Sequence, residues 1–311
     1  MSRRAIISDV HSNLIALEAV LADIQQQHVD GIVCLGDICG YGPQPTECID
    51  RVRALALWTL MGNHDEALFV EPKDFGKNAR LAIEWQKQVL EPGLVSTQLD
   101  EERWYWLEHL SPRRLENDVL FVHASPREPL YEYVLREDFL DTGFGPSEKA
   151  QGYFQAIKWL CFCGHSHRPG VVAEDYQWYK PEELNDYTYV LKQGGKTLIN
   201  VGSVGQPRDG LTSACYCIFN LPETGGPTGA PPPGANLQSN TPAVNLNIEN
   251  IGVLDETRTS DELQRARSSL ILALPRVTFR RVPYDVAAAQ ALFRTVPELP
   301  ESNALRLAQG R

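Results

Sequence analysis

Short polar clusters directly after strand-like apolar runs are the feature that most constrains this 311-residue chain. Five of its seven histidines lie in such clusters, and Gly36-Asp37 adds a carboxylate in the same context. The other clusters are Asp9-Val10-His11, Gly62-Asn63-His64-Asp65, Val122-His123-Ala124 and Gly164-His165-Ser166-His167. A single histidine at a strand end is about as often a structural residue as a functional one. The repetition of the pattern favours a functional interpretation for the group.

Apolar runs before and between these clusters predict the secondary structure. Strands are expected at 5–8, 31–35, 56–61, 119–122, 159–163, 197–200 and 214–219. Helices are expected where Leu14, Leu17, Leu21 and Ile24 recur at helical spacing, and at 78–90 and 99–110. Alternating strands and helices predict an α/β chain with a mainly parallel sheet, whose ligands gather beyond the carboxyl ends of the strands. The strand-rich second half predicts a further sheet.

The clusters combine imidazole, carboxylate and amide groups, which are expensive to bury together. Unpaired, they would cost on the order of several kcal/mol, and a bound cation removes that cost. Imidazole with carboxylate and one amide oxygen suits Mn, Fe or Zn better than Mg or Ca. A carboxylate can bridge two ions at roughly 3.5–4 Å, the separation used in phosphoryl displacement. Asp37 is the natural bridge, so we expect two divalent or transition metal ions.

Composition narrows the partners and the compartment. The 40 acidic and 29 basic residues give a net charge of -11, which repels phosphate backbones, so no binding of duplex nucleic acid is expected. No apolar stretch approaches the roughly 20 residues of a spanning helix, and the N-terminus does not resemble a signal peptide. We therefore expect a cytoplasmic protein without membrane partners. The sequence gives no indication of protein partners.

The chain is expected to form a single domain over residues 1–311, interrupted by one segment. Residues 221–260 are rich in Pro, Gly, Asn and Thr with little periodicity, which predicts a flexible insertion. Residues 277–282 then alternate like a strand and 286–293 have the pattern of a helix. We expect this C-terminal strand and helix to complete the fold.

In this order, the five polar clusters resemble the signature of the calcineurin-like metallophosphoesterase superfamily. The similarity covers about residues 5–220, and the C-terminal strand and helix resemble those of the small prokaryotic, phosphodiesterase-like members. The resemblance implies a four-layer αββα sandwich of two mixed β-sheets flanked by helices, an α/β (α+β) fold. It also implies a metal ligand set and a free histidine, His64, for catalysis. The first metal would be held by Asp9, His11, Asp37 and His167, and the second by Asp37, Asn63, His123 and His165.

This chain differs from the protein-phosphatase branch of the superfamily in a residue that binds phosphate. That branch has an Asp-Arg-Gly triplet soon after its Gly-Asp, whereas this chain continues Ile38-Cys39-Gly40-Tyr41. The missing arginine weighs against protein serine/threonine phosphatase activity. Arg127 and Arg208 are the candidate substitutes for holding an anionic ester, and a surface ion pair or a loop brace is an equally good interpretation of each.

The expected activity is hydrolysis of phosphodiesters or phosphomonoesters by in-line attack of a metal-bridging hydroxide. His64 would donate a proton to the leaving oxygen, and Asp65 would orient its imidazole. The expected substrate is a small phosphate ester. The alternative activities are those of a serine/threonine protein phosphatase and a dinucleoside polyphosphate hydrolase. A metal-stabilised binding scaffold is the non-enzymatic alternative.

Overall fold

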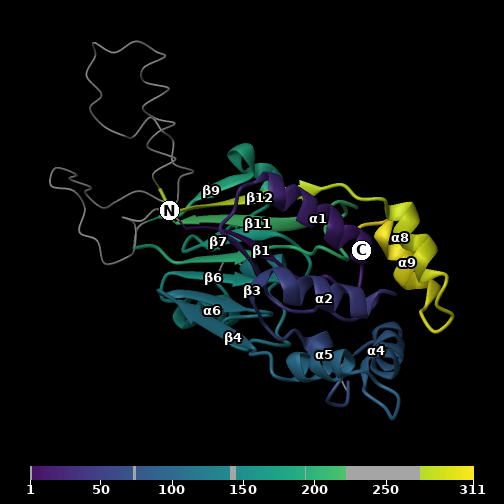
Figure 1. Cartoon of the computed structure of the whole chain (residues 1–311). Helices are drawn as coiled ribbons and strands as arrows, with labels where there is room; N and C mark the ends of the chain where they lie inside the picture. Colours follow the sequence, from purple (N-terminus) through teal and green to yellow (C-terminus); the bar gives the residue numbers. More distant parts are fainter. Residues whose placement is uncertain (1, 73–74, 141–144, 193, 222–273) are drawn as a thin grey trace, which may run out of the picture.

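Two mixed β-sheets of six strands each lie face to face, and helices cover their outer faces (Figure 1). The structure is a computed structural model, and it describes residues 2–72, 75–140, 145–192, 194–221 and 274–311. The insertion predicted at 221–260 lies outside these residues except for Leu221, which ends a strand. The four-layer sandwich expected from the sequence is confirmed.

The first sheet combines the N-terminal strands with strands from the far end of the chain. Its order is β3 (Ala56–Thr59), β2 (Gly31–Cys34), β1 (Ser2–Ile7), β11 (Ala214–Leu221), β12 (Arg276–Val282) and β9 (Thr188–Val190). The strands β1, β2 and β3 are parallel, whereas β11, β12 and β9 add in antiparallel fashion. The three parallel strands therefore end at one edge of this sheet.

The second sheet has a parallel centre as well. Its order is β4 (Arg113–Glu116), β5 (Val119–Val122), β6 (Leu160–Cys163), β10 (Thr197–Asn200), β7 (Gly170–Ala173) and β8 (Trp178–Tyr179). Strands β5, β6 and β10 are parallel. Strand β4 pairs antiparallel with β5, β7 with β10, and β8 with β7. The carboxyl ends of these parallel strands give a second set of loops.

The helices are α1 (Leu14–Gln26), α2 (Pro45–Leu55), α3 (Asn63–Glu66), α4 (Lys77–Leu90), α5 (Gln98–Glu108), α6 (Glu148–Ala156), α8 (Val286–Phe293) and α9 (Glu301–Leu307). Helix α1 begins where the sequence predicts it, because the Asn13 side chain accepts a hydrogen bond from the Ala16 amide and caps the first turn. None of the described helices has the length and apolar character needed to span a bilayer.

Three apolar cores fill the spaces between the four layers. Leu17, Val20 and Ile49 pack helices α1 and α2 on the first sheet. Side chains such as Phe162 and Phe279 fill the space between the sheets. Tyr153, Phe154 and their neighbours pack α6 on the outer face of the second sheet. The packing of both sheets through one shared core holds the two sets of strand ends in a fixed relation.

The C-terminal strand is tied to the N-terminal helix by a polar cluster. Arg280 of β12 makes two hydrogen bonds to the Asp23 carboxylate of α1, at 2.6 and 3.0 Å, and the Tyr216 hydroxyl of β11 donates to the same group at 2.6 Å. Burial opposes ionisation of Asp23, but these hydrogen bonds outweigh it and lower its pKa below the usual value. We propose that residues 1–311 fold as one domain, with this cluster joining its two ends.

Replacing Asp23 with Asn is expected to lower the free energy of unfolding by about 1–2 kcal/mol at pH 7, measured by chemical denaturation. The folded-state pKa of Asp23 lies below its unfolded value, so its stabilisation is present above about pH 4 and is lost as the pH falls further. The difference between wild type and variant should therefore shrink in acid. Glu18 lies on α1 like Asp23, and Glu18→Gln, which breaks its exposed pair with Arg51 of α2, should cost less than about 0.5 kcal/mol. An equal effect of the two substitutions would contradict the assignment.

Candidate metal centre

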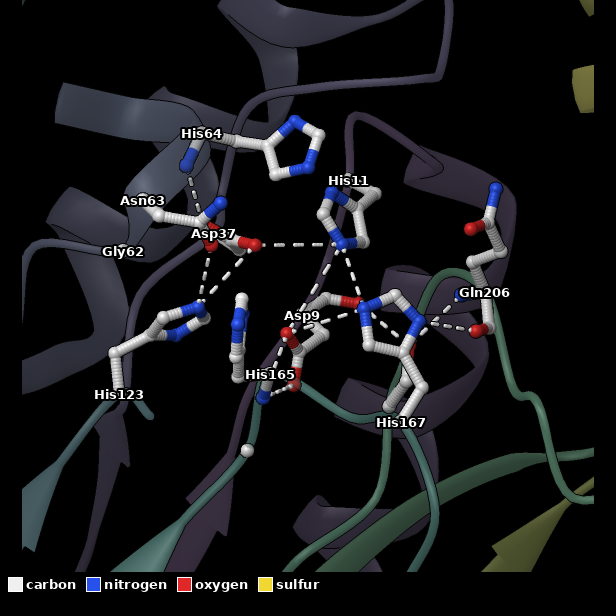
Figure 2. A network of polar contacts seen from close by, with 12 residues as sticks. Asp9, His11, Asp37, Gly62, Asn63, His64, His123, His165, His167 and Gln206 are labelled. Atoms are coloured by element: carbon white, nitrogen blue, oxygen red, sulfur yellow. Dashed lines mark hydrogen bonds and ion pairs between the residues drawn. The ribbon is translucent and has the colours of Figure 1, made fainter. Parts of the chain in front are cut away.

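The polar clusters singled out in the sequence meet at one place, between the carboxyl ends of the parallel strands of both sheets (Figure 2). Strands β1, β2 and β3 lead into the loops of the first sheet, and β5 and β6 lead into those of the second. The side chains brought together are Asp9, His11, Asp37, Asn63, His64, His123, His165 and His167, and all of them are buried. The convergence predicted from the sequence is therefore found in the structure.

Two overlapping groups of donor atoms could each hold a metal ion. Asp9, His11, Asp37 and His167 form one group, and Asp37, His123 and His165 form the other. Within each group the donor atoms lie within 4.8 Å of one another, and Asp37 belongs to both. The Asn63 Oδ1 atom lies 3.0 Å from the His123 Nε2 atom, which brings the amide oxygen to the second group.

A backbone carbonyl fixes the orientation of each histidine in these groups. The contacts are His11 Nδ1 to Cys39 O at 2.9 Å, His123 Nδ1 to Leu35 O at 3.1 Å, His165 Nε2 to Tyr131 O at 3.1 Å and His167 Nδ1 to Gln206 O at 2.5 Å. A carbonyl oxygen only accepts, so the contacting ring nitrogen carries the proton. In His11, His165 and His167, whose pKa values burial lowers, the other ring nitrogen then presents a lone pair to the centre.

These lone pairs need a cation among them. The Nε2 atoms of His11 and His167 lie 3.0 Å apart, and carboxylate oxygens of Asp9 and Asp37 lie within 4.0 Å of them. Burial, and then the charge of His167, keeps the pKa of His11 well below its usual value, so protonation does not supply the missing donor. The donor set fits metal ions, because a cation between acceptors removes both the repulsion and the desolvation cost.

The two aspartates are held by backbone amides. The His64 amide donates to Asp37 at 2.8 Å, and the His165 amide donates to both oxygens of Asp9 at 3.1 Å. Burial opposes the ionisation of Asp9, but His167 and the neighbouring imidazoles hold its pKa far below the usual range. Burial also disfavours the charged ring of His123, yet Asp37 and Asp9 raise the pKa of that imidazole to about 9. The Asp9 carboxylate is therefore anionic at neutral pH.

The backbone at the centre adopts left-handed conformations that few residues tolerate. The φ angles are 54° at Asp9, 49° at His11, 52° at Asp37, 61° at His165 and 58° at His167. Asp and His adopt such angles more readily than most residues, but each still costs roughly 1–3 kcal/mol. Hydrogen bonds between adjacent loops hold this geometry, including one from the His11 amide to the Asp37 carbonyl at 2.9 Å.

His64 and Asp65 lie beside the two groups of donor atoms. The His64 ring packs against those of His11, Tyr41 and Phe75 with centroids 4.7–4.8 Å away, and its Nδ1 atom has no hydrogen-bond partner among the described residues. Burial, followed by the charge of His11, lowers the pKa of His64 well below its usual value. The free imidazole expected from the sequence is therefore present as a neutral ring.

Asp65 differs from the expectation that it orients the His64 ring. Its carboxylate accepts hydrogen bonds from the Cys39 amide at 2.9 Å and from the Gly62 amide at 3.0 Å. Both oxygens are thus engaged by backbone, and the side chain joins the loop after β2 to the start of α3. Burial and the nearby Asp37 raise the pKa of Asp65 to about 7.

The two candidate arginines lie in different places. The Arg127 guanidinium contacts Glu132 at 3.4 Å and lies 6.0 Å from the ring of Tyr153 in α6. These contacts match the structural role, bracing a loop, that the sequence analysis gave as the alternative for Arg127. The structure therefore does not support Arg127 as a residue that binds substrate. Arg208 lies next to the centre, 5.4 Å from the ring of Tyr41, and its charge adds to burial in lowering the pKa of His167.

Sequence reasoning missed two contributors to the centre. Gln86 of α4 is fully buried, accepts from the Gly40 amide at 2.6 Å and donates to the Gly42 carbonyl at 2.7 Å, which braces the loop after β2. The sequence does contain an indication of this role, because Gln86 is a polar residue on the otherwise apolar face of the expected helix. Tyr133 stacks on the His165 ring with centroids 3.9 Å apart, and nothing in its sequence context marks it.

Comparison with known proteins agrees with this geometry. Residues 3–224 match the calcineurin-like phosphoesterase superfamily domain. The chain belongs to this superfamily. Its members are metal-dependent hydrolases of phosphoric esters, so membership makes this chain an enzyme of that class.

One protein of similar sequence and two solved structures resemble this chain. An uncharacterised protein of Methanocaldococcus jannaschii is 39% identical over 224 residues, which cover 70% of this chain and 82% of that protein. The crystal structure of a metallophosphoesterase from Sphaerobacter thermophilus is 34% identical with a TM-score of 0.67, covering 100% of this chain and 99% of the other. A hypothetical protein from Pyrococcus horikoshii OT3, 14% identical with a TM-score of 0.61 and coverage of 100% and 99%, shares the fold.

Replacing Gly62 with Ala is expected to disturb the shared carboxylate. An added Cβ atom would lie 2.1 Å from the Asp37 Oδ1 atom and 2.2 Å from its backbone nitrogen, so Asp37 must move. We expect the purified variant to hold less metal than wild type by elemental analysis. Gly76→Ala is the matched control, because a Cβ atom there meets nothing within 4 Å. Full metal content in Gly62→Ala would show that the position of Asp37 is not critical.

Proposed function

We propose that this chain is a dinuclear phosphoesterase that hydrolyses phosphodiesters or phosphomonoesters of modest size. The observation that carries the proposal is the Asp37 carboxylate, which belongs to both groups of donor atoms. A shared carboxylate is the arrangement that places two cations within roughly 4 Å of each other. The superfamily assignment supports the reaction class.

The proposed ligands follow from the two groups. One ion would be held by Asp9, His11, Asp37 and His167, and the other by Asp37, Asn63, His123 and His165. Imidazole, carboxylate and amide donors suit Mn, Fe or Zn. When bound, such ions supply Lewis acidity toward the phosphoryl oxygens and lower the pKa of bound water.

His64 is the proposed proton donor to the leaving oxygen. Its ring is buried beside the donor groups, neutral, and without a competing hydrogen bond at Nδ1 among the described residues. An anionic ester next to the ring favours its protonated form, so a larger fraction of His64 carries the proton to be donated once substrate is bound. Packing against Tyr41 and Phe75 holds the ring in place.

Arg208 is the proposed grip on the ester. The Gln206 side-chain oxygen accepts from its Nε and Nη2 atoms at 3.2 and 2.7 Å, which fixes the guanidinium without neutralising it. The same Gln206 holds His167 through its backbone carbonyl. A fixed, uncompensated cation at this position would bind a non-bridging phosphoryl oxygen.

His64→Ala is expected to lower kcat by about 100-fold or more on an ester with a poor alkoxide leaving group, because the proton donor is lost. The loss should be smaller with a p-nitrophenolate leaving group, which needs no proton. Metal content should stay at the wild-type level, and the exposed substitution His28→Asn should leave kcat unchanged. A variant that keeps the full rate on the poor leaving group would remove His64 from the mechanism.

Metal removal tests the reaction class. Chelation should abolish hydrolysis of bis-p-nitrophenyl phosphate and p-nitrophenyl phosphate, and added Mn should restore it. The same assay with dinucleoside polyphosphates and phosphopeptides ranks the alternative substrates, and a strong preference for phosphopeptide would favour a protein phosphatase. The scaffold alternative would gain support if wild type hydrolysed none of these while Asp37→Asn unfolded the protein.

A further inference from the structure

A cleft of about 580 Å³ lies beside the candidate metal centre and shares Arg208 with it. The other cationic side chains that line the cleft are those of Arg136, Arg168 and Lys180. Arg168 directly follows His167 in the chain, so the cleft continues from the loop that carries a proposed metal ligand. A ligand held at Arg208 could therefore extend into this cleft without crossing a layer of the fold.

The acidic side chains that line the cleft are engaged by other groups. Glu182 and Asp209 both pair with Arg281, Glu137 lies 3.6 Å from Arg168, and Glu183 accepts from the Lys180 backbone amide at 2.8 Å. In contrast, the side chains of Arg136 and Lys180 have no ionic partner among the residues that the structure describes.

Arg208 completes a set of three cations without a carboxylate partner, since its side-chain hydrogen bonds go to the neutral Gln206. These three cations come from separate segments of a chain whose net charge is -11. Uncompensated cations that converge on a cleft in an acidic protein indicate an anion-binding site.

An apolar surface accompanies the charges. Trp178 and Pro169 line the same cleft, and the indole of Trp178 lies so close over Gly170 that an added Cβ atom would meet its Cε2 atom at 2.3 Å. The Trp178 ring is also packed against Phe139, with centroids 6.0 Å apart. A rigid indole face of this kind packs well against a sugar or another compact organic group.

We propose that this cleft binds a second phosphate group of the substrate, remote from the phosphorus that is attacked, with the intervening organic group against Trp178. The inference rests on the proposed function, because it extends the same site. Because Arg208 holds the phosphoryl group that is attacked, Arg136 and Lys180 are the cations left for the second phosphate. Two cations suit a dianion better than a singly charged carboxylate, and a guanidinium group pairs with phosphate in a bidentate manner. The cleft would thus select esters that carry two phosphate groups over esters with one.

The test uses two thymidine 5′-(p-nitrophenyl phosphate) esters, one with a 3′-phosphate and one with a free 3′-hydroxyl. The scissile bond and the leaving group are the same in both, so their KM values differ only through the second phosphate. Wild type is expected to have a KM about tenfold lower for the 3′-phosphate ester, with similar kcat. Arg136→Gln and Lys180→Gln should each raise that KM about fivefold and leave the other ester unchanged.

Two further measurements distinguish failure of the cleft proposal from failure of the proposed function. Arg51→Gln removes an equal charge from α2, where Arg51 pairs with Glu18 of α1, and should change neither KM. Calorimetric binding of thymidine 3′,5′-bisphosphate and thymidine 5′-monophosphate reports on the cleft without turnover. Equal KM values for the two hydrolysed esters, or equal losses in Arg51→Gln, would overturn the inference. Tighter binding of the bisphosphate that depends on Arg136 and Lys180, without hydrolysis of either ester, would uphold the cleft and reject the proposed function.

Discussion

The fixed protonation pattern of the buried imidazoles is the constraint on which the centre depends. Each ring gives its outer N–H to a backbone carbonyl. In His11, His165 and His167, whose pKa values burial lowers, the inner nitrogen is then an acceptor. The carboxylates of Asp9 and Asp37 add further acceptors at the same place. Backbone carbonyls of the surrounding loops thereby leave a set of acceptors that fits metal ions.

The loops accept unfavourable backbone conformations to keep this arrangement. Five of the proposed ligands have positive φ angles, and hydrogen bonds between the loops after β1 and β2 hold two of the strained stretches together. Gln86 and Asp65 add side-chain braces to the loop after β2. Such strain is tolerated when the surroundings over-determine it, and here the two sheets provide that rigid frame.

The sequence predicted which polar residues follow the ends of the main strands. It did not predict side-chain contacts that depend on packing between distant segments. Strand ends with polar residues were recognisable because apolar runs stop there, so the convergence around Asp37 was predictable. Strands β4, β7, β8 and β9 were not predicted, since segments of two to four residues carry too little periodicity to be recognised on their own. The engagement of Asp65 by backbone amides and the turn of Arg127 toward Glu132 depend on packing between distant segments, which no local pattern encodes.

Strand β12 of the first sheet has a consequence for biosynthesis. It pairs with β11 along Ala214–Asn220 and carries Arg280, whose partner Asp23 lies 257 residues away in sequence. Until the ribosome has released this strand, β11 presents an open, apolar edge of the kind that recruits other strands. A nascent or truncated chain ending before β12 would therefore depend on chaperones, although every proposed ligand of the metal centre would already have been synthesised.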